Sequence, residues 1–106
     1  MVDKTKILTD LKSHLLKNYG QSVNDVILFG SQVLGNSNEN SDYDVLIILK
    51  NDYTGKDENQ ILDLCYEIDL KFNINTDTHV IGETELDTLR GKQPIFVNAI
   101  ANGIHA

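Results

Sequence analysis

Two aspartates, Asp42 and Asp44, open an apolar segment that has the pattern of a buried strand. Side chains alternate faces along a strand, so both carboxylates share one face, with Cα atoms roughly 6.5–7 Å apart. Two like charges at this separation repel each other unless a cation lies between them. Mg²⁺ suits the arrangement, because proteins hold it with one or two carboxylates together with substrate phosphates. The pair therefore predicts a magnesium site that a phosphorylated substrate completes.

Gly30 and Ser31 close the preceding apolar segment and are suited to hold that phosphate. Glycine lets the main chain approach a ligand closely, and the serine hydroxyl and the following N–H groups can donate to phosphate oxygens. If Ser31 begins a helical turn, the helix N-terminus adds a favourable dipole. Together with the two aspartates, these residues predict a site for a nucleotide and its metal ion.

Other interpretations of the same residues remain open. The two aspartates can be solvated charges at a strand end, while Gly30 and Ser31 can be a turn residue and a helix cap. A calcium-binding loop is a further alternative, but its glycine at the sixth position and its closing glutamate are missing. The alternating residues behind that alternative are Asn36, Asn38, Asn40, Asp42 and Asp44.

The spacing of these residues resembles the signature of minimal nucleotidyltransferases of the DNA polymerase β-like superfamily. It consists of Gly30-Ser31, ten further residues and then Asp42-Tyr43-Asp44. The spacing is also similar to that of antitoxins paired with HEPN ribonuclease toxins, and the resemblance covers nearly the whole chain. It implies transfer of AMP from ATP to a tyrosine hydroxyl of the toxin, assisted by a pair of Mg²⁺ ions. It also implies that Asp42 and Asp44 hold the triphosphate-bound metal and that Ser31 holds the leaving pyrophosphate.

The same resemblance implies a third carboxylate on the next core strand, where it would complete the metal site and help to activate the attacking hydroxyl. Asp77 occupies the matching strand, so the implied catalytic and metal-binding set is Asp42, Asp44 and Asp77. Asp69 is the rival, but it lies in a helical pattern, where a solvated charge is expected. Asp77 can also be an edge-strand charge that blocks sheet-to-sheet pairing. His79 lies on the same face of that strand as Asp77, where it can either hydrogen-bond Asp77 or serve as a packing or surface residue.

Two departures from the family pattern bear on nucleotide binding. Many members of the family carry arginines just after Gly-Ser that bind the triphosphate, whereas this sequence has Gln32, Val33 and Leu34 there. This difference predicts a weaker affinity or a cation supplied by a partner. The sequence also ends soon after the core, so a partner protein is expected to supply the helical domain with which larger relatives hold nucleotide and acceptor.

Hydrophobic periodicity and turn residues predict the elements that position these groups. The strands on either side of the Gly-Ser turn are separated by only about eleven residues, so they are antiparallel or joined by one helical turn. The predicted helices are Lys4–Tyr19, Asp57–Phe72, Thr84–Leu89 and Ile95–Asn102, and the predicted strands are Asp25–Gly30, Asp42–Leu49 and Asn75–Gly82. This order predicts an α/β (α+β) fold, a small mixed sheet of three to four strands with helices on one face.

Composition limits the classes of protein and partner. The chain has 106 residues without a repeat or linker, which predicts a single minimal nucleotidyltransferase domain over residues 1–106. The formal net charge of −7 argues against a grip on long nucleic acid, but it suits a metal-bound nucleoside triphosphate or a basic protein partner. The longest apolar stretch, Val45–Leu49, is too short to cross a bilayer, and the charged N-terminus is unlike a signal peptide. The single cysteine, Cys65, allows no internal disulfide.

We therefore expect a cytoplasmic protein, and three functions remain open to it. The first is a Mg²⁺-dependent nucleotidyltransferase that uses ATP and modifies a HEPN-type toxin. The second is a non-catalytic acidic antitoxin that masks its partner, and the third is a remnant that only binds nucleotide. A second copy of the chain is left open as a further partner.

Overall fold

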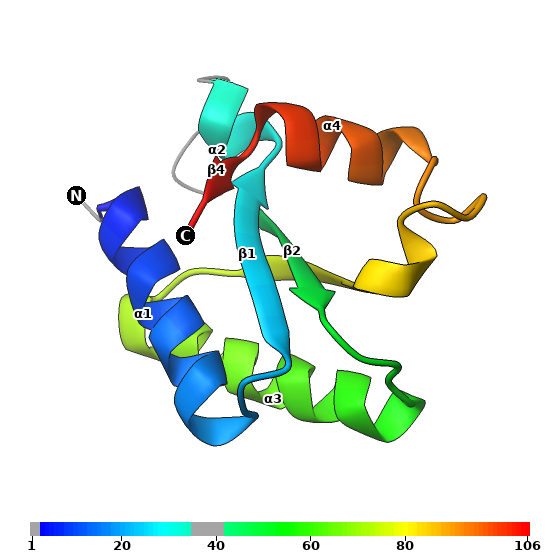
Figure 1. Cartoon of the computed structure of the whole chain (residues 1–106). Helices are drawn as coiled ribbons and strands as arrows, with labels where there is room; N and C mark the ends of the chain where they lie inside the picture. Colours follow the sequence, from blue (N-terminus) through cyan, green and yellow to red (C-terminus); the bar gives the residue numbers. More distant parts are fainter. Residues whose placement is uncertain (1–2, 35–41) are drawn as a thin grey trace.

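The computed structural model describes residues 3–34 and 42–106, and within them the strands form one mixed sheet in the order β3-β2-β1-β4 (Figure 1). The elements are α1 (Lys4–Asn18), β1 (Val23–Phe29), α2 (Ser31–Leu34), β2 (Tyr43–Leu49), α3 (Gly55–Phe72), β3 (Thr76–Gly82), the 3₁₀ turn η1 (Glu83–Glu85), α4 (Pro94–Asn102) and β4 (Ile104–His105). The predicted α/β fold with a small mixed sheet is confirmed. Within the described ranges, no helix is both long and apolar enough to cross a membrane.

The two long helices begin at side-chain caps and bury one apolar stripe each. Asp3 accepts a hydrogen bond from the N–H of Thr5 at the start of α1. Thr54 and Asp57 form a reciprocal capping box at the start of α3, which therefore begins two residues before its predicted start. The buried stripes explain why both helices could be predicted: Ile7, Leu8, Leu11 and Leu15 on α1, and Ile61, Leu64, Cys65 and Ile68 on α3.

The register of the sheet brings the ends of β1, β2 and β3 together. β1 and β2 are antiparallel, with Phe29 opposite Asp44, and the connection between them begins with the single helical turn α2. β2 and β3 are parallel, joined through α3, with Asp44 opposite Asp77. Both alternatives for the β1–β2 connection therefore occur together, since the strands are antiparallel and a helical turn lies between them.

Helices cover both faces of the sheet, so the expectation that they cover only one face is wrong. α1 and α3 pack on one face in a core that includes Val45 and Ile47 of β2. α4 packs on the other face, where Phe96 and Ala99 meet Leu46 and Ile48 of the same strand (Figure 1). The alternation along β2 explains this division, because successive side chains point to opposite faces and both sets are buried.

Two further features near the C-terminal end differ from the prediction. The helix expected over Thr84–Leu89 is reduced to η1 and a series of turns, because no side chain of that segment is buried and a short helix is unstable without packing. β4 was not predicted, and it pairs with β1 in antiparallel fashion through Ile27 opposite His105. A two-residue strand has too little pattern of its own to be detected in sequence.

Candidate active site

Two carboxylates and an imidazole meet where β2 and β3 begin. Asp44 and Asp77 are direct neighbours in the parallel register, and His79 lies on the same face two residues further along β3. One ligand atom from each of these three residues lies within 4.8 Å of the others. The strand alternation places all three on the face of the sheet that α4 covers. Two residues separated by more than thirty positions in sequence thus form one acidic cluster.

Asp42 stands immediately before β2, rather than within it as predicted, and its side chain is exposed. It lies outside the three-residue cluster, but its charge acts on Asp44. The structure therefore brings Asp77 directly beside Asp44 and leaves Asp42 at the open edge of the same site.

The electrostatics of Asp44 favour a cation at this position. Burial raises the pKa of the Asp44 carboxyl above its usual range, and the negative charges of Asp77 and Asp42 raise it further, while the charge of His79 lowers it. Neighbouring carboxylates disfavour each other's ionisation, and a positive charge between them stabilises their ionised forms. Their oxygens are also the donors that Mg²⁺ prefers, so the residues present fit that ion.

His79 contributes in a different way from the carboxylates. Its Nε2 lies 3.6 Å from Oδ2 of Asp77, which is an ion-pair contact and too long for a hydrogen bond. Its ring centroid lies 5.9 Å from that of Phe29, in a tilted arrangement. Because an imidazole nitrogen is a less typical Mg²⁺ ligand than an oxygen, this geometry suits a residue that positions Asp77.

Gly30 adjoins Asp44 so closely that a side chain there would displace the Asp44 carboxylate. Its φ of +79° lies in the left-handed region that favours glycine. An added Cβ would overlap the Asp44 carboxylate and would stand 3.0 Å from Asp44 Cγ. The sequence predicted Gly30 as a phosphate contact but gave no sign of this second requirement.

The turn after Gly30 is described only in part. Ser31 begins α2, so the condition stated for it is met. Its side chain lies outside the described part of the structure, as do residues 36, 38 and 40 of the calcium-loop alternative. Gln32 is buried, and its main-chain oxygen accepts a hydrogen bond from the ammonium group of Lys4. Gln32 is therefore packed inside the protein.

Asp69, the rival for the third carboxylate, has a structural environment of its own. Its Oδ2 accepts a hydrogen bond from the N–H of Thr76 at 3.2 Å, which secures the start of β3. Its Oδ1 is buried and has no hydrogen-bond partner among the described residues, and burial raises the pKa of this carboxyl. The expectation that Asp69 is a solvated charge is therefore wrong, and it does not belong to the cluster around Asp44.

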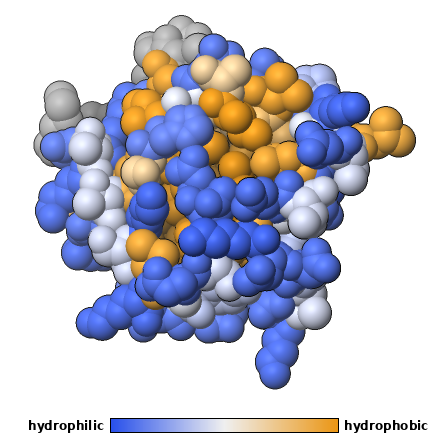
Figure 2. Space-filling model, viewed as in Figure 1, coloured by the Kyte–Doolittle hydropathy of each residue, from blue (hydrophilic) through white to orange (hydrophobic). Residues whose placement is uncertain are grey.

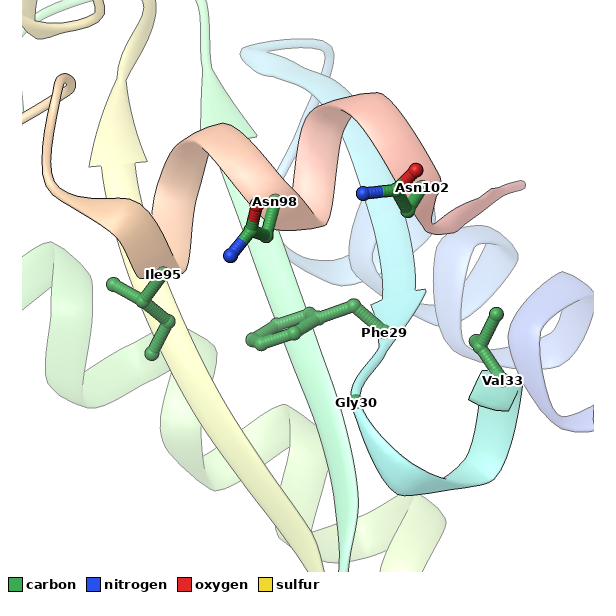
Figure 3. Close-up of a pocket in the computed structure, with 6 residues that line it drawn as sticks. All are labelled: Phe29, Gly30, Val33, Ile95, Asn98 and Asn102. Atoms are coloured by element: carbon green, nitrogen blue, oxygen red, sulfur yellow. The ribbon is translucent and has the colours of Figure 1, made fainter. Parts of the chain in front are cut away.

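A cavity of about 450 Å³ opens beside Gly30. It lies between the end of β1, the turn α2 and the helix α4, as Figure 3 shows. Its lining residues are Phe29, Gly30, Val33, Ile95, Asn98 and Asn102. The sequence predicted a helix over Ile95–Asn102 but not this cavity.

Comparison with known proteins identifies the class. The family model described as "Nucleotidyltransferase domain" matches residues 5–100. A protein of Methanocaldococcus jannaschii, MJ0141, which is provisionally named as a protein adenylyltransferase, is 33% identical over 69 residues, a span of 65% of this chain and 70% of that protein. The chain therefore belongs to the nucleotidyltransferase domain family and is a nucleotidyltransferase.

Two solved structures share the fold. One is a toxin–antitoxin with AMP-PNP, with a TM-score of 0.57 and 16% identity over 91% of this chain and 69% of that chain. The other is a variant of the toxin–antitoxin MntA–HpeT, with a TM-score of 0.59 and 14% identity over 98% of this chain and 72% of that chain. At these identities the likeness shows the arrangement of the elements alone.

Proposed function

We propose that this chain transfers AMP from ATP to a tyrosine hydroxyl of a HEPN-type toxin and thereby acts as its antitoxin. The observation that carries the proposal is the placement of Asp44 beside Asp77, against the left-handed turn at Gly30. The name of the relative MJ0141 supports protein adenylylation, and the toxin–antitoxin neighbours support a toxin as the partner.

In this proposal Asp42, Asp44 and Asp77 hold Mg²⁺, and Gly30 and Ser31 hold the phosphates. The metal supplies positive charge that neutralises the triphosphate and lowers the pKa of the attacking hydroxyl. The tyrosine oxygen forms a bond to the α-phosphorus, and the bond from that phosphorus to the α,β-bridging oxygen breaks. Pyrophosphate leaves with the electron pair, and the hydroxyl proton passes to the Asp77 carboxylate or to water. The chain's own contribution is alignment and charge placement, as in other phosphoryl chemistry.

The experiment combines the purified chain, the product of the neighbouring reading frame and ATP labelled at either the α- or the γ-phosphate. We expect label from α-labelled ATP on the partner, no label from γ-labelled ATP, and loss of labelling on addition of EDTA. Asp44→Asn is expected to lower the rate at least about 100-fold, because it removes one charge from the metal site. Asp63→Asn, the same change on the exposed face of α3, serves as the matched control. Transfer of the γ-label, or full activity of Asp44→Asn, would contradict the proposal.

A second candidate is an acidic binding module that neutralises the partner without catalysis. The observation that favours it is a stripe of exposed apolar side chains on α3, namely Leu62, Tyr66 and Leu70, on a chain with a net charge of −7. Figure 2 shows hydrophobic side chains gathered over the α4 side of the visible face as well, where Ile95 and Val97 are exposed. If the double substitution Asp42→Asn with Asp44→Asn still neutralises the toxin in cells as well as the wild type does, this second function replaces the first.

A further inference from the structure

The cavity beside Gly30 has a chemical character opposite to that of the acidic cluster. Among the described residues, the six that line it are uncharged: Phe29, Val33 and Ile95 supply apolar surface, Asn98 and Asn102 supply carboxamide groups, and Gly30 has no side chain. The two asparagines lie one turn apart on α4, and Figure 3 shows both on the side of the helix that borders the cavity. A site of this kind suits a flat, neutral group with polar edges, and its volume lies within the range of small-molecule pockets.

Gly30 connects this neutral cavity with the carboxylates. The glycine lines the cavity and also adjoins the Asp44 carboxylate. Phe29, the neighbouring residue in the cavity wall, lies opposite Asp44 in the sheet and near the His79 ring. A ligand that spans Gly30 would therefore place a neutral part among Phe29 and the asparagines and an anionic part, with its cation, at the aspartates. A nucleotide with its metal ion has both parts, a neutral base and an anionic phosphate group that carries the cation.

We propose that the cavity binds the adenine base of the donor nucleotide, with the Asn98 and Asn102 carboxamides on its polar edge and with Phe29 and Ile95 against its faces. This inference rests on the proposed function and assigns α4 a role in choosing the nucleotide. An asparagine carboxamide offers one acceptor and two donors, which match the N7 acceptor and N6 amino donor of adenine. The same pair of groups matches guanine less well, because O6 of guanine is an acceptor.

The test separates base recognition from phosphate recognition. Binding of ATP, GTP and inorganic tripolyphosphate, each with Mg²⁺, is measured by calorimetry on the wild type, Asn98→Ala, Asn102→Ala and Asp44→Asn. Asn59→Ala, the same change on the exposed surface of α3, is the matched control. We expect each cavity variant to bind ATP roughly 2- to 10-fold more weakly, as loss of one or two neutral hydrogen bonds predicts. Tripolyphosphate affinity is expected to stay unchanged in both cavity variants.

The possible results distinguish this inference from the proposed function. If the wild type prefers ATP to GTP and only the cavity variants lose that preference, the inference stands. If Asp44→Asn loses all three ligands while the cavity variants bind ATP as the wild type does, the cavity is not the base site but the metal–nucleotide site remains. If the wild type binds neither ATP nor tripolyphosphate, both proposals are wrong. Equal weakening of ATP and tripolyphosphate in the cavity variants would also overturn the inference, since it would indicate a general distortion of α4.

Discussion

Replacing Gly30 by alanine tests the central geometric feature of the site, the contact between this glycine and Asp44. The substitution has two separable costs. An alanine at a φ of +79° is strained by about 1–2 kcal/mol, because its Cβ approaches the carbonyl of its own chain. In addition, the new Cβ overlaps the Asp44 carboxylate, so that side chain must leave its place beside Asp77.

Gly20→Ala is the matched control because it has the first cost without the second. Gly20 has a φ of +132°, and no described atom lies within 4 Å of a Cβ placed there. Urea denaturation is expected to show that both variants lose about 1–3 kcal/mol of unfolding free energy. Only Gly30→Ala is expected to bind Mg²⁺–tripolyphosphate about 10- to 100-fold more weakly, the range typical when a group that orients a metal ligand is disturbed.

Tripolyphosphate is the appropriate ligand for this comparison, because Gly30 also lines the cavity proposed for the base. If Gly30→Ala binds tripolyphosphate as tightly as Gly20→Ala does, the close packing of Gly30 against Asp44 has no role in the metal site. If both variants lose affinity equally, the loss reflects general destabilisation, and the reasoning from the overlap is refuted.

Two further predictions concern the other carboxylates and the last strand. Asp77→Asn is expected to weaken Mg²⁺–nucleotide binding, measured by calorimetry, with little effect on stability. Asp69→Ala is expected to bind nucleotide normally but to lose about 1–3 kcal/mol of unfolding free energy in urea denaturation, because the Thr76 N–H loses its acceptor. The reverse outcome would make Asp69 the third carboxylate. The Asp25 carboxylate accepts a hydrogen bond from Nδ1 of protonated His105 and thereby raises the pKa of that histidine. The pair therefore stabilises β4 below the ordinary histidine pKa and ceases to do so as pH rises through the raised value. The melting temperature of the wild type should therefore fall slightly as pH rises above the ordinary histidine pKa, and that of His105→Gln should fall less. Identical pH profiles would refute the assignment.

Local patterns allowed α1, α3, α4, three strands and the carboxylate pair to be predicted, because each depends on residues close in sequence. The stripes of α1 and α3 recur every three or four residues, and Asp42 and Asp44 precede a run of buried apolar residues. The parallel pairing that sets Asp77 beside Asp44 was not predicted, and Asp77 was selected only through the resemblance to a family. Catalytic roles for these aspartates stay predictions until the substitutions are measured.

The features that sequence did not predict depend on tertiary contacts. α4 packs against Ile27, Leu46, Ile48 and Ile81. The continuous apolar run of β2 indicates burial on both faces of the sheet, but it does not indicate which helix covers each face. Asp69 looks like a surface charge in the helical pattern, yet the following turn brings the Thr76 N–H against it. The same reason applies to β4, where the hydrogen bonds to β1 define a strand that its two residues do not specify.

The balance of charge explains how so acidic a chain can be a nucleotidyltransferase. The chain has a net charge of −7, so it repels a triphosphate that lacks its cation. Burial and the neighbouring negative charges also disfavour the ionised form of Asp44. On the proposed function, Mg²⁺ relieves both repulsions at once, so the metal and the nucleotide each raise the affinity for the other by the same factor. The neutral cavity then adds affinity that needs no positive charge on the protein. On this proposal, the site needs no cation at position 32, where the structure has a buried glutamine.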